Sequence, residues 1–527
     1  MLITKFETKI ILSLIVFSSI IIFFTVLQLN KFNLYYLSFS LISTILVVNS
    51  IKNNNYGNIF INTFFYLGFF FKISIIIIIS NNLGTNIYFE ESYLFLNVNS
   101  NFFKIIFIKL SIFFLLLIFF ENLLIGKNKI KTIYKNNFHE HFIKKKKKIV
   151  FIFVLFLIIF FNYLNYRFEI IQRGSLSFST TYTNIFKIIN YFGQSALICL
   201  IIDIEKKLDS KKIIFIYLLI FSSILNHLTI LSRSGIFEIL AILYIFTKDN
   251  PKQGLFLIFL SLLIWILSFN LANDLRLIKV NNYNDEKANN KNLQSIKVDK
   301  FDELNKKNLK TEKNSIKVNN TNCLETKNCE TDKKLNIDQK IISDPQSDEL
   351  ILENSEEMLN KQNNYIDKIR SNKFTYLLVY RWTGIDGFIN TEIKDDKNIG
   401  NLLGSFYEIK RNLNGTYYER TFFKVPNKQI YNQTFIPGYL AFANFGNNYT
   451  FFFGAFLLIM IILIFNKILN IFMRDFEYFK CFIFFIVAWR LAHFGILPLN
   501  TLIYFLTIIV FIIVVSSGIK IFDKIYS

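Results

Sequence analysis

Arginine is scarce in this chain, and the few arginines are the residues best suited to bind an anion. The sequence holds 59 Lys plus Arg, but only ten of these are Arg, and the first 166 residues contain none. A guanidinium binds phosphate or carboxylate oxygens through two parallel hydrogen bonds and stays charged in a dry site, which a lysine ammonium does not match. We therefore expect the retained arginines to mark places where an anionic group is bound.

One arginine lies between two apolar runs, in the sequence Ser232-Arg233-Ser234-Gly235. We expect a tight turn with Arg233 at its apex, because the glycine permits the turn. The two serines and the free backbone amides that open the following helix would complete a cradle for an anion. The alternative is that Arg233 extends to the membrane surface or pairs with Glu238.

Two further segments place ionisable residues near the ends of apolar runs. In Arg381-Trp-Thr-Gly-Ile-Asp386 we expect a helix at the membrane surface that presents Arg381 to the neighbouring helices. Its alternative is a helix whose arginine faces lipid headgroups. Arg490 and His493 are three residues apart, which places both on one face of a helix. Ionisable groups in a span are costly and often mark a site, although a buried pair held by backbone carbonyls is the alternative.

Other residues would complete the same site. Arg173 and Arg276 lie just outside apolar runs and would extend the cationic surface. A general base must be a group that accepts a proton near neutral pH, and the sequence offers four candidates: Asp386, Glu408, Glu419 and His493. Residues 435–450, with a Pro-Gly pair and a further glycine, predict a shaped approach to the next apolar run that walls the site.

The apolar runs predict the elements that position these residues. Hydrophobic residues make up 53% of the chain, and runs of about 20 apolar residues recur. We predict an all-α polytopic membrane protein of about twelve transmembrane helices: 9–29, 32–51, 58–80, 102–125, 149–166, 184–203, 213–231, 235–247, 254–272, 449–468, 478–495 and 500–519. Lysine-rich short loops, above all 126–148, would be cytoplasmic, and so would both termini. The net charge of +21 comes mostly from this lysine, so no nucleic-acid partner is expected.

The spans divide the chain into three segments. Residues 1–272 would form a transmembrane bundle of nine spans, and residues 449–527 one of three. Residues 273–448 would form one large external loop. Within it, about 281–365 is rich in Asn, Lys, Asp and Glu and poor in aromatic residues, which predicts a disordered insert that is dispensable for chemistry.

The four cysteines do not indicate a metal site. Cys199 and Cys481 fall within predicted spans, where we expect them to be packing residues. Cys323 and Cys329 fall within the predicted insert, where an oxidising compartment would permit a disulfide. Their spacing lacks the further Cys or His ligands of a zinc site.

These motifs resemble those of bacterial O-antigen polymerases, the Wzy-type family that joins oligosaccharide repeat units. The similar features are the Ser-Arg-Ser-Gly turn, the large loop before the last spans, the Arg-Trp-Thr-Gly motif and the Pro-Gly…Asn-Phe-Gly segment before the tenth span. They cover about 170–270 and 366–500, and residue by residue they support Arg233, Arg381 and Arg490. Paired Arg-x10-Gly loop motifs, found in some members, are absent. The resemblance implies a helical membrane fold similar to that of GT-C-type glycosyltransferases.

The resemblance also implies a reaction and a place for it. Such polymerases act at the periplasmic face of the bacterial inner membrane, where a sugar chain leaves undecaprenyl pyrophosphate for a hydroxyl of a new lipid-linked unit. We expect a metal-independent enzyme without a cofactor, whose catalytic residues are Arg233, Arg381, Arg490, His493 and Asp386. Arg173, Arg276, Ser232 and Ser234 would bind the substrate.

The expected partners are the undecaprenyl-pyrophosphate-linked oligosaccharide, the lipid bilayer and a chain-length regulator protein. Three other functions fit parts of the same pattern. An O-antigen ligase uses the same donor but a lipid A-core acceptor, a flippase moves the lipid-linked sugar without chemistry, and a glycan-binding membrane protein only holds it. A flippase would show two similar halves and mid-membrane cations, whereas this chain lacks an internal repeat and gathers its arginines at one face.

Overall fold

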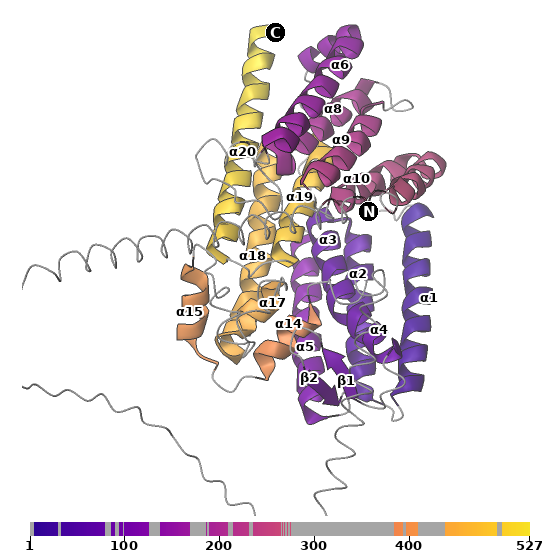
Figure 1. Cartoon of the computed structure of the whole chain (residues 1–527), viewed down its shortest axis with the longest axis vertical. Helices are drawn as coiled ribbons and strands as arrows, with labels where there is room; N and C mark the ends of the chain where they lie inside the picture. Colours follow the sequence, from indigo (N-terminus) through magenta and orange to yellow (C-terminus); the bar gives the residue numbers. More distant parts are fainter. Residues whose placement is uncertain are drawn as a thin grey trace, which may run out of the picture. The chain divides into compact units, whose positions relative to one another are not determined.

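The architecture is described from a computed structural model of the whole chain (Figure 1). The structure describes residues 5–29, 33–79, 86–89, 94–97, 100–125, 137–168, 186, 189–208, 214–230, 235–264, 266, 268, 271, 275, 384–393, 397–408, 438–492 and 498–526. The chain divides into two compact units, Met1–Ala272 with Asn372–Ser527, and Asn273–Ser371. Every contact described below lies within the first unit. The predicted insert at 281–365 lies outside the described residues, as do Cys323 and Cys329.

Helices make up nearly all of the described structure. In the first part of the chain they are α1 (Lys5–Gln28), α2 (Leu34–Asn53), α3 (Tyr56–Phe65), the π-helix η1 (Tyr66–Phe71), α4 (Lys72–Ile79), α5 (Asn101–Ile125) and α6 (Asn137–Phe168). They continue with the π-helix η3 (Ile189–Gly193), α8 (Gln194–Leu208), α9 (Phe215–Ile230) and α10 (Gly235–Asp249). After the long loop come α14 (Ile385–Glu392), α15 (Ile399–Tyr407), α17 (Gly438–Asn444), α18 (Asn448–Phe472), α19 (Glu477–Ala492) and α20 (Pro498–Tyr526).

Among the described residues, seven helices are long and apolar enough to cross a membrane, which makes the chain a multi-pass helical membrane protein. They are Lys5–Gln28, Leu34–Asn53, Tyr56–Ile78, Asn101–Leu123, Lys147–Phe168, Asn448–Phe472 and Pro498–Ile521. The other five predicted spans coincide with shorter helices, namely η3 with α8, α9, α10, Pro251–Ile264 and α19. Twelve crossings therefore stay a prediction.

Between α4 and α5 the chain forms a short hairpin that the apolar pattern did not predict. Strands β1 (Asn86–Phe89) and β2 (Leu94–Asn97) are antiparallel, with Asn86 opposite Asn97 and Phe89 opposite Leu94. Their Ile, Tyr and Phe residues favour a pleated strand. Four residues are the shortest run over which apolar–polar alternation indicates a strand.

The surface of α1 is that of a helix in lipid. Large apolar side chains such as Leu12, Phe23 and Leu27 are exposed along it. Only 17% of its most apolar stretch of 18 residues is buried inside the protein. In water such a surface would drive association, whereas in a bilayer it faces hydrocarbon. Part of the core instead lies between α2 and α5, where Phe39 stacks on Phe107 and Phe114. Cys199 and Cys481 are buried thiols, as expected of packing residues.

Polar contacts among the described residues join the helix ends in two sets. One set joins ends that were expected to be cytoplasmic: Glu7 with Lys248, Tyr56 with Glu477, and Lys206 with Asp249 and Glu477. The other joins Lys109, near the start of α5, to Glu392 at the end of α14 and Asn448 at the start of α18. Ends that were predicted to share a face therefore do meet. Which face is cytoplasmic stays a prediction.

Candidate functional site

The segment after Arg-Trp-Thr-Gly rests on a π-helix in the third membrane span. At Gly384, just before α14, a Cβ atom would lie 1.9 Å from the carbonyl oxygen of Gly68 in η1, so the two backbones touch and no larger residue fits without movement. Phe388 on α14 then packs against Phe69 of η1 and Phe451 of α18, with ring centroids 6.4 and 5.4 Å apart. A π-helix inside an α-helical span is uncommon and often lies at a functional site.

A buried ion pair fixes the same helix to the same span. Lys72 follows η1 directly, and its Nζ lies 2.6 Å from Oδ2 of Asp386, with both side chains 0% exposed. Asp386 was expected to be catalytic. The structure encloses its carboxylate completely and gives it a cationic partner, whereas a general base needs hydrogen-bond reach to its substrate. This placement favours a role in holding α14 in position.

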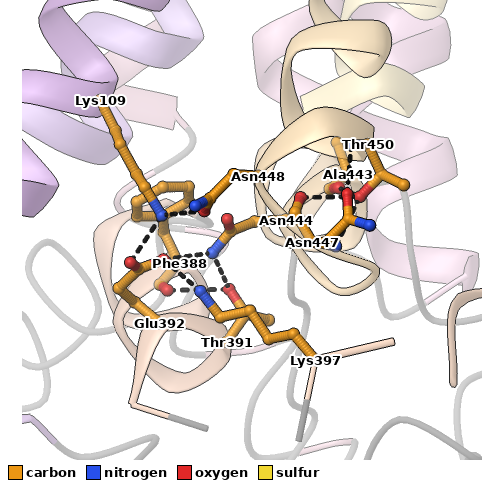
Figure 2. Close-up of polar contacts among 10 residues, drawn as sticks. All are labelled: Lys109, Phe388, Thr391, Glu392, Lys397, Ala443, Asn444, Asn447, Asn448 and Thr450. Carbon is orange, nitrogen blue, oxygen red and sulfur yellow. Dashed lines mark hydrogen bonds and ion pairs between the residues drawn. The ribbon is translucent and has the colours of Figure 1, made fainter. Parts of the chain in front are cut away.

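At the other end of α14, Glu392 is the centre of a polar cluster that joins α14 to α5, α17 and α18 (Figure 2). Its Oε1 accepts a hydrogen bond from Lys109 Nζ of α5 at 2.6 Å. Its Oε2 accepts from Lys397 Nζ at 2.6 Å and from Asn444 Nδ2 of α17 at 2.9 Å. Lys109 also donates to Oδ1 of Asn448 at 2.7 Å. We call Lys109, Glu392, Lys397, Asn444 and Asn448 the Glu392 cluster.

The cluster is partly exposed, and Lys109 and Lys397 stabilise the ionised carboxylate of Glu392. The side chains of Lys109, Glu392 and Lys397 are 12%, 10% and 14% exposed. Burial alone would raise the pKa of Glu392, but hydrogen bonds from Lys109, Lys397 and Asn444 outweigh it and hold that pKa below the ordinary value. Burial lowers the pKa of Lys397 despite its hydrogen bond to Glu392. The carboxylate is therefore ionised at neutral pH.

The Pro-Gly…Asn-Phe-Gly segment forms one wall of this cluster. Its residues 438–444 form α17, a short buried helix that begins at Gly438 with φ 76°, which favours glycine. Asn447 then caps α18, because its side chain accepts from the Thr450 amide while the Thr450 hydroxyl accepts from the Asn447 amide. Asn444, at the end of α17, also donates to Oγ1 of Thr391 at 3.0 Å.

Arg490 lies apart from the contacts of the Glu392 cluster. It is in the last turn of α19, half-buried, with its Cζ 4.2 Å from the ring centroid of Tyr504 on α20. A guanidinium over an aromatic face is held by cation–π attraction. Its planar fork keeps N–H donors at the edge, and these suit an anion.

Most of the expected site residues lie outside the described residues: Arg173, Ser232, Arg233, Ser234, Arg276, Arg381, Glu419 and His493. Of the expected catalytic residues, the structure describes Asp386 and Arg490. Glu408 follows the last residue of α15. The structure thus describes neither the predicted Arg233 turn nor the Arg490–His493 pair.

Sequence reasoning missed Glu392, Lys397 and Asn444, and it placed neither Lys72 nor Lys109 among the site residues. The available signal was that both lysines lie within apolar runs, where a charged group is costly and needs a partner. Their partners are far along the chain: Lys109 and Glu392 are 283 residues apart. Spacing rules for helices reach only three or four residues, so the pairing itself was not visible.

Comparison with known proteins identifies no relative: no family model, no curated protein and no solved structure matches this chain. Within the described part of the chain, no group of three or more His, Cys, Asp or Glu side chains is placed to hold a metal ion. The chemistry that the Glu392 cluster can perform therefore follows from its own side chains. These are an ionised carboxylate, two ammonium groups and amide side chains at one end of a membrane bundle.

Proposed function

We propose that this chain is a polymerase of undecaprenyl-pyrophosphate-linked oligosaccharide repeat units, acting at the outer face of the inner membrane. The observation that supports it best is the meeting of two motif segments. α14, which follows Arg-Trp-Thr-Gly, is joined to α17 of the Pro-Gly…Asn-Phe-Gly segment by hydrogen bonds from Asn444 to Thr391 and Glu392. These segments are two of the features on which the family resemblance rests.

The chemistry of glycosyl transfer from a lipid pyrophosphate matches the residues available. A departing pyrophosphate needs fixed positive charge, which Arg233, Arg381 and Arg490 would supply as two-point donors. The attacking sugar hydroxyl needs a base. Sugar hydroxyls are also well matched by amide and ammonium side chains such as those of the Glu392 cluster.

The test is polymer formation by purified protein in vesicles that contain purified lipid-linked repeat units and no lipid A-core acceptor. A polymerase extends the chain by whole units under these conditions, whereas a ligase or a flippase leaves single units. Arg233→Lys and Arg381→Lys should each reduce the rate by about 30- to 1,000-fold, because an ammonium keeps the charge but loses the fork.

Arg474→Lys is the matched control, because Arg474 lies at the turn between α18 and α19 near the opposite helix ends. It should keep wild-type polymer formation. Single units alone from the wild-type protein would refute the proposal, and full activity of both Arg→Lys variants would remove these arginines from the reaction.

A further inference from the structure

Asp386 and Glu392, the carboxylates of α14, differ in their exposure to solvent. Asp386 is 0% exposed and paired with Lys72. Glu392, on the same helix, is 10% exposed. Since both side chains leave α14 within two turns of each other, the helix holds one carboxylate in the interior and brings the other to the surface of the cluster.

Glu392 has acceptor capacity left. An ionised carboxylate offers about four lone-pair positions, two on each oxygen. Among the described residues, Oε2 accepts from Lys397 and Asn444, while Oε1 accepts from Lys109 alone. Within this part of the chain one acceptor position on Oε1 is therefore open, on a side chain that is not fully covered.

The partners of Glu392 also fix its direction. Lys109 is itself held by Asn448, and Asn444 is held by Thr391, so the donors around the carboxylate are tied to α5, α14, α17 and α18. A base must be held to within a fraction of an ångström of its working position. Each lysine has three N–H donors, and those not used on Glu392 or Asn448 can hold the oxygen of a bound hydroxyl.

We propose that Glu392 is the general base of the transfer, which rests on the proposed function. The open position of Oε1 accepts the proton of the attacking acceptor hydroxyl. The hydroxyl oxygen forms the new bond to the anomeric carbon of the donor chain, and the bond from that carbon to the pyrophosphate oxygen breaks. The pyrophosphate leaves with the electron pair, and the proton remains on Glu392 until solvent removes it.

The experiment measures kcat, KM and the pH profile of polymer formation on purified lipid-linked units. Glu392→Gln keeps the size and most hydrogen bonds but accepts no proton, so kcat should fall by about 10²- to 10⁴-fold with KM for the acceptor little changed. Glu477→Gln is the matched control. Glu477 is also ion-paired with a lysine and hydrogen-bonded by a tyrosine, but at the opposite helix ends, and its variant should keep wild-type kcat.

A second variant distinguishes two roles for Glu392, a general base and a purely structural ion-pair partner. Lys397→Met removes one cation from Glu392 and should raise the pKa of the carboxyl, so the acidic limb of the kcat/KM profile should move to higher pH. An ion pair that only holds helices together would leave that limb in place. Polymer from the wild type with an unmoved limb, or near-wild-type kcat in Glu392→Gln, overturns the inference alone. Absence of polymer from the wild type overturns the proposed function instead.

Discussion

Neutralising Lys72 should destabilise the protein far more than neutralising a lysine whose partners are partly exposed to water. In Lys72→Met the carboxylate of Asp386 would stay 0% exposed without its cation. Removing one partner of a buried pair typically costs about 3–5 kcal/mol, because a lone charge remains in a low-dielectric site. That corresponds to roughly a 150- to 5,000-fold shift in the unfolding equilibrium.

The double variant Lys72→Met, Asp386→Leu should recover most of this loss. Replacing both charges by apolar side chains of similar volume is often neutral or stabilising, since neither group must then be desolvated. Lys206→Met is the control. Its partners Asp249 and Glu477 are 36% and 43% exposed, so water screens their charges and the cost should stay within about 1 kcal/mol.

Unfolding in mixed micelles with rising SDS, followed by tryptophan fluorescence, gives the free energies for the three variants. A Lys72→Met variant within about 1 kcal/mol of wild type would show that the pair is not dry, and the argument from burial would fail. Polymer formation by the double variant adds a second result. We expect activity to persist, and a stable but inactive double variant would return Asp386 to the catalytic residues.

Two further outcomes follow from the geometry around α14. Gly384→Ala should cost about 1–3 kcal/mol in the same unfolding assay, because its Cβ would meet the Gly68 carbonyl oxygen at 1.9 Å. Gly518→Ala should be neutral or slightly stabilising, because outside its own helix its Cβ would meet no atom of the described residues within 4 Å. The stability that Glu392 contributes, measured as wild type minus Glu392→Gln, should be present in full above the ordinary Glu pKa of 4.5 and be lost as the pH falls through its lowered folded value. A difference that already vanishes above that pH would contradict the ionised cluster.

The membrane helices were predictable because length and apolarity are properties of each segment alone. A run of about 20 apolar residues fits the bilayer thickness whatever it contacts, which is why α1, α2, α5, α18 and α20 coincide closely with predicted spans. The shorter helices α9, α10 and α19 show the limit of that reasoning. Their buried faces are covered by protein, and α19 is buried along most of its length, so neither their length nor their apolarity must match a bilayer.

The candidate site was less predictable, because its main contacts join residues that are far apart in sequence. The Pro-Gly pair and the further glycine before α18 indicated a shaped segment, and the structure describes part of it as α17. Most of the residues that this segment was expected to enclose lie outside the described residues. Lys109 alone gave no sign of whether it extends to the surface or pairs with a carboxylate. That choice depends on where Glu392 lies in three dimensions, and no local rule of spacing or propensity contains this information.

The contacts at the start of α14 fix the position of the carboxylate at its end. A helix of eight residues is too short to be stable alone, so it needs tertiary contacts before it can hold a reactive carboxylate in place. The Gly384–Gly68 contact and the Lys72–Asp386 pair supply them at its start, in the interior of the third span. Asp386 and Glu392 are then separated by about 9 Å of helix rise, which leaves Glu392 at the edge of the protein, where Lys109 and Lys397 orient it. A buried ion pair contributes little net stability. In this fold the ion pair holds α14 in one position. It thereby also holds the base at the end of α14 in one position.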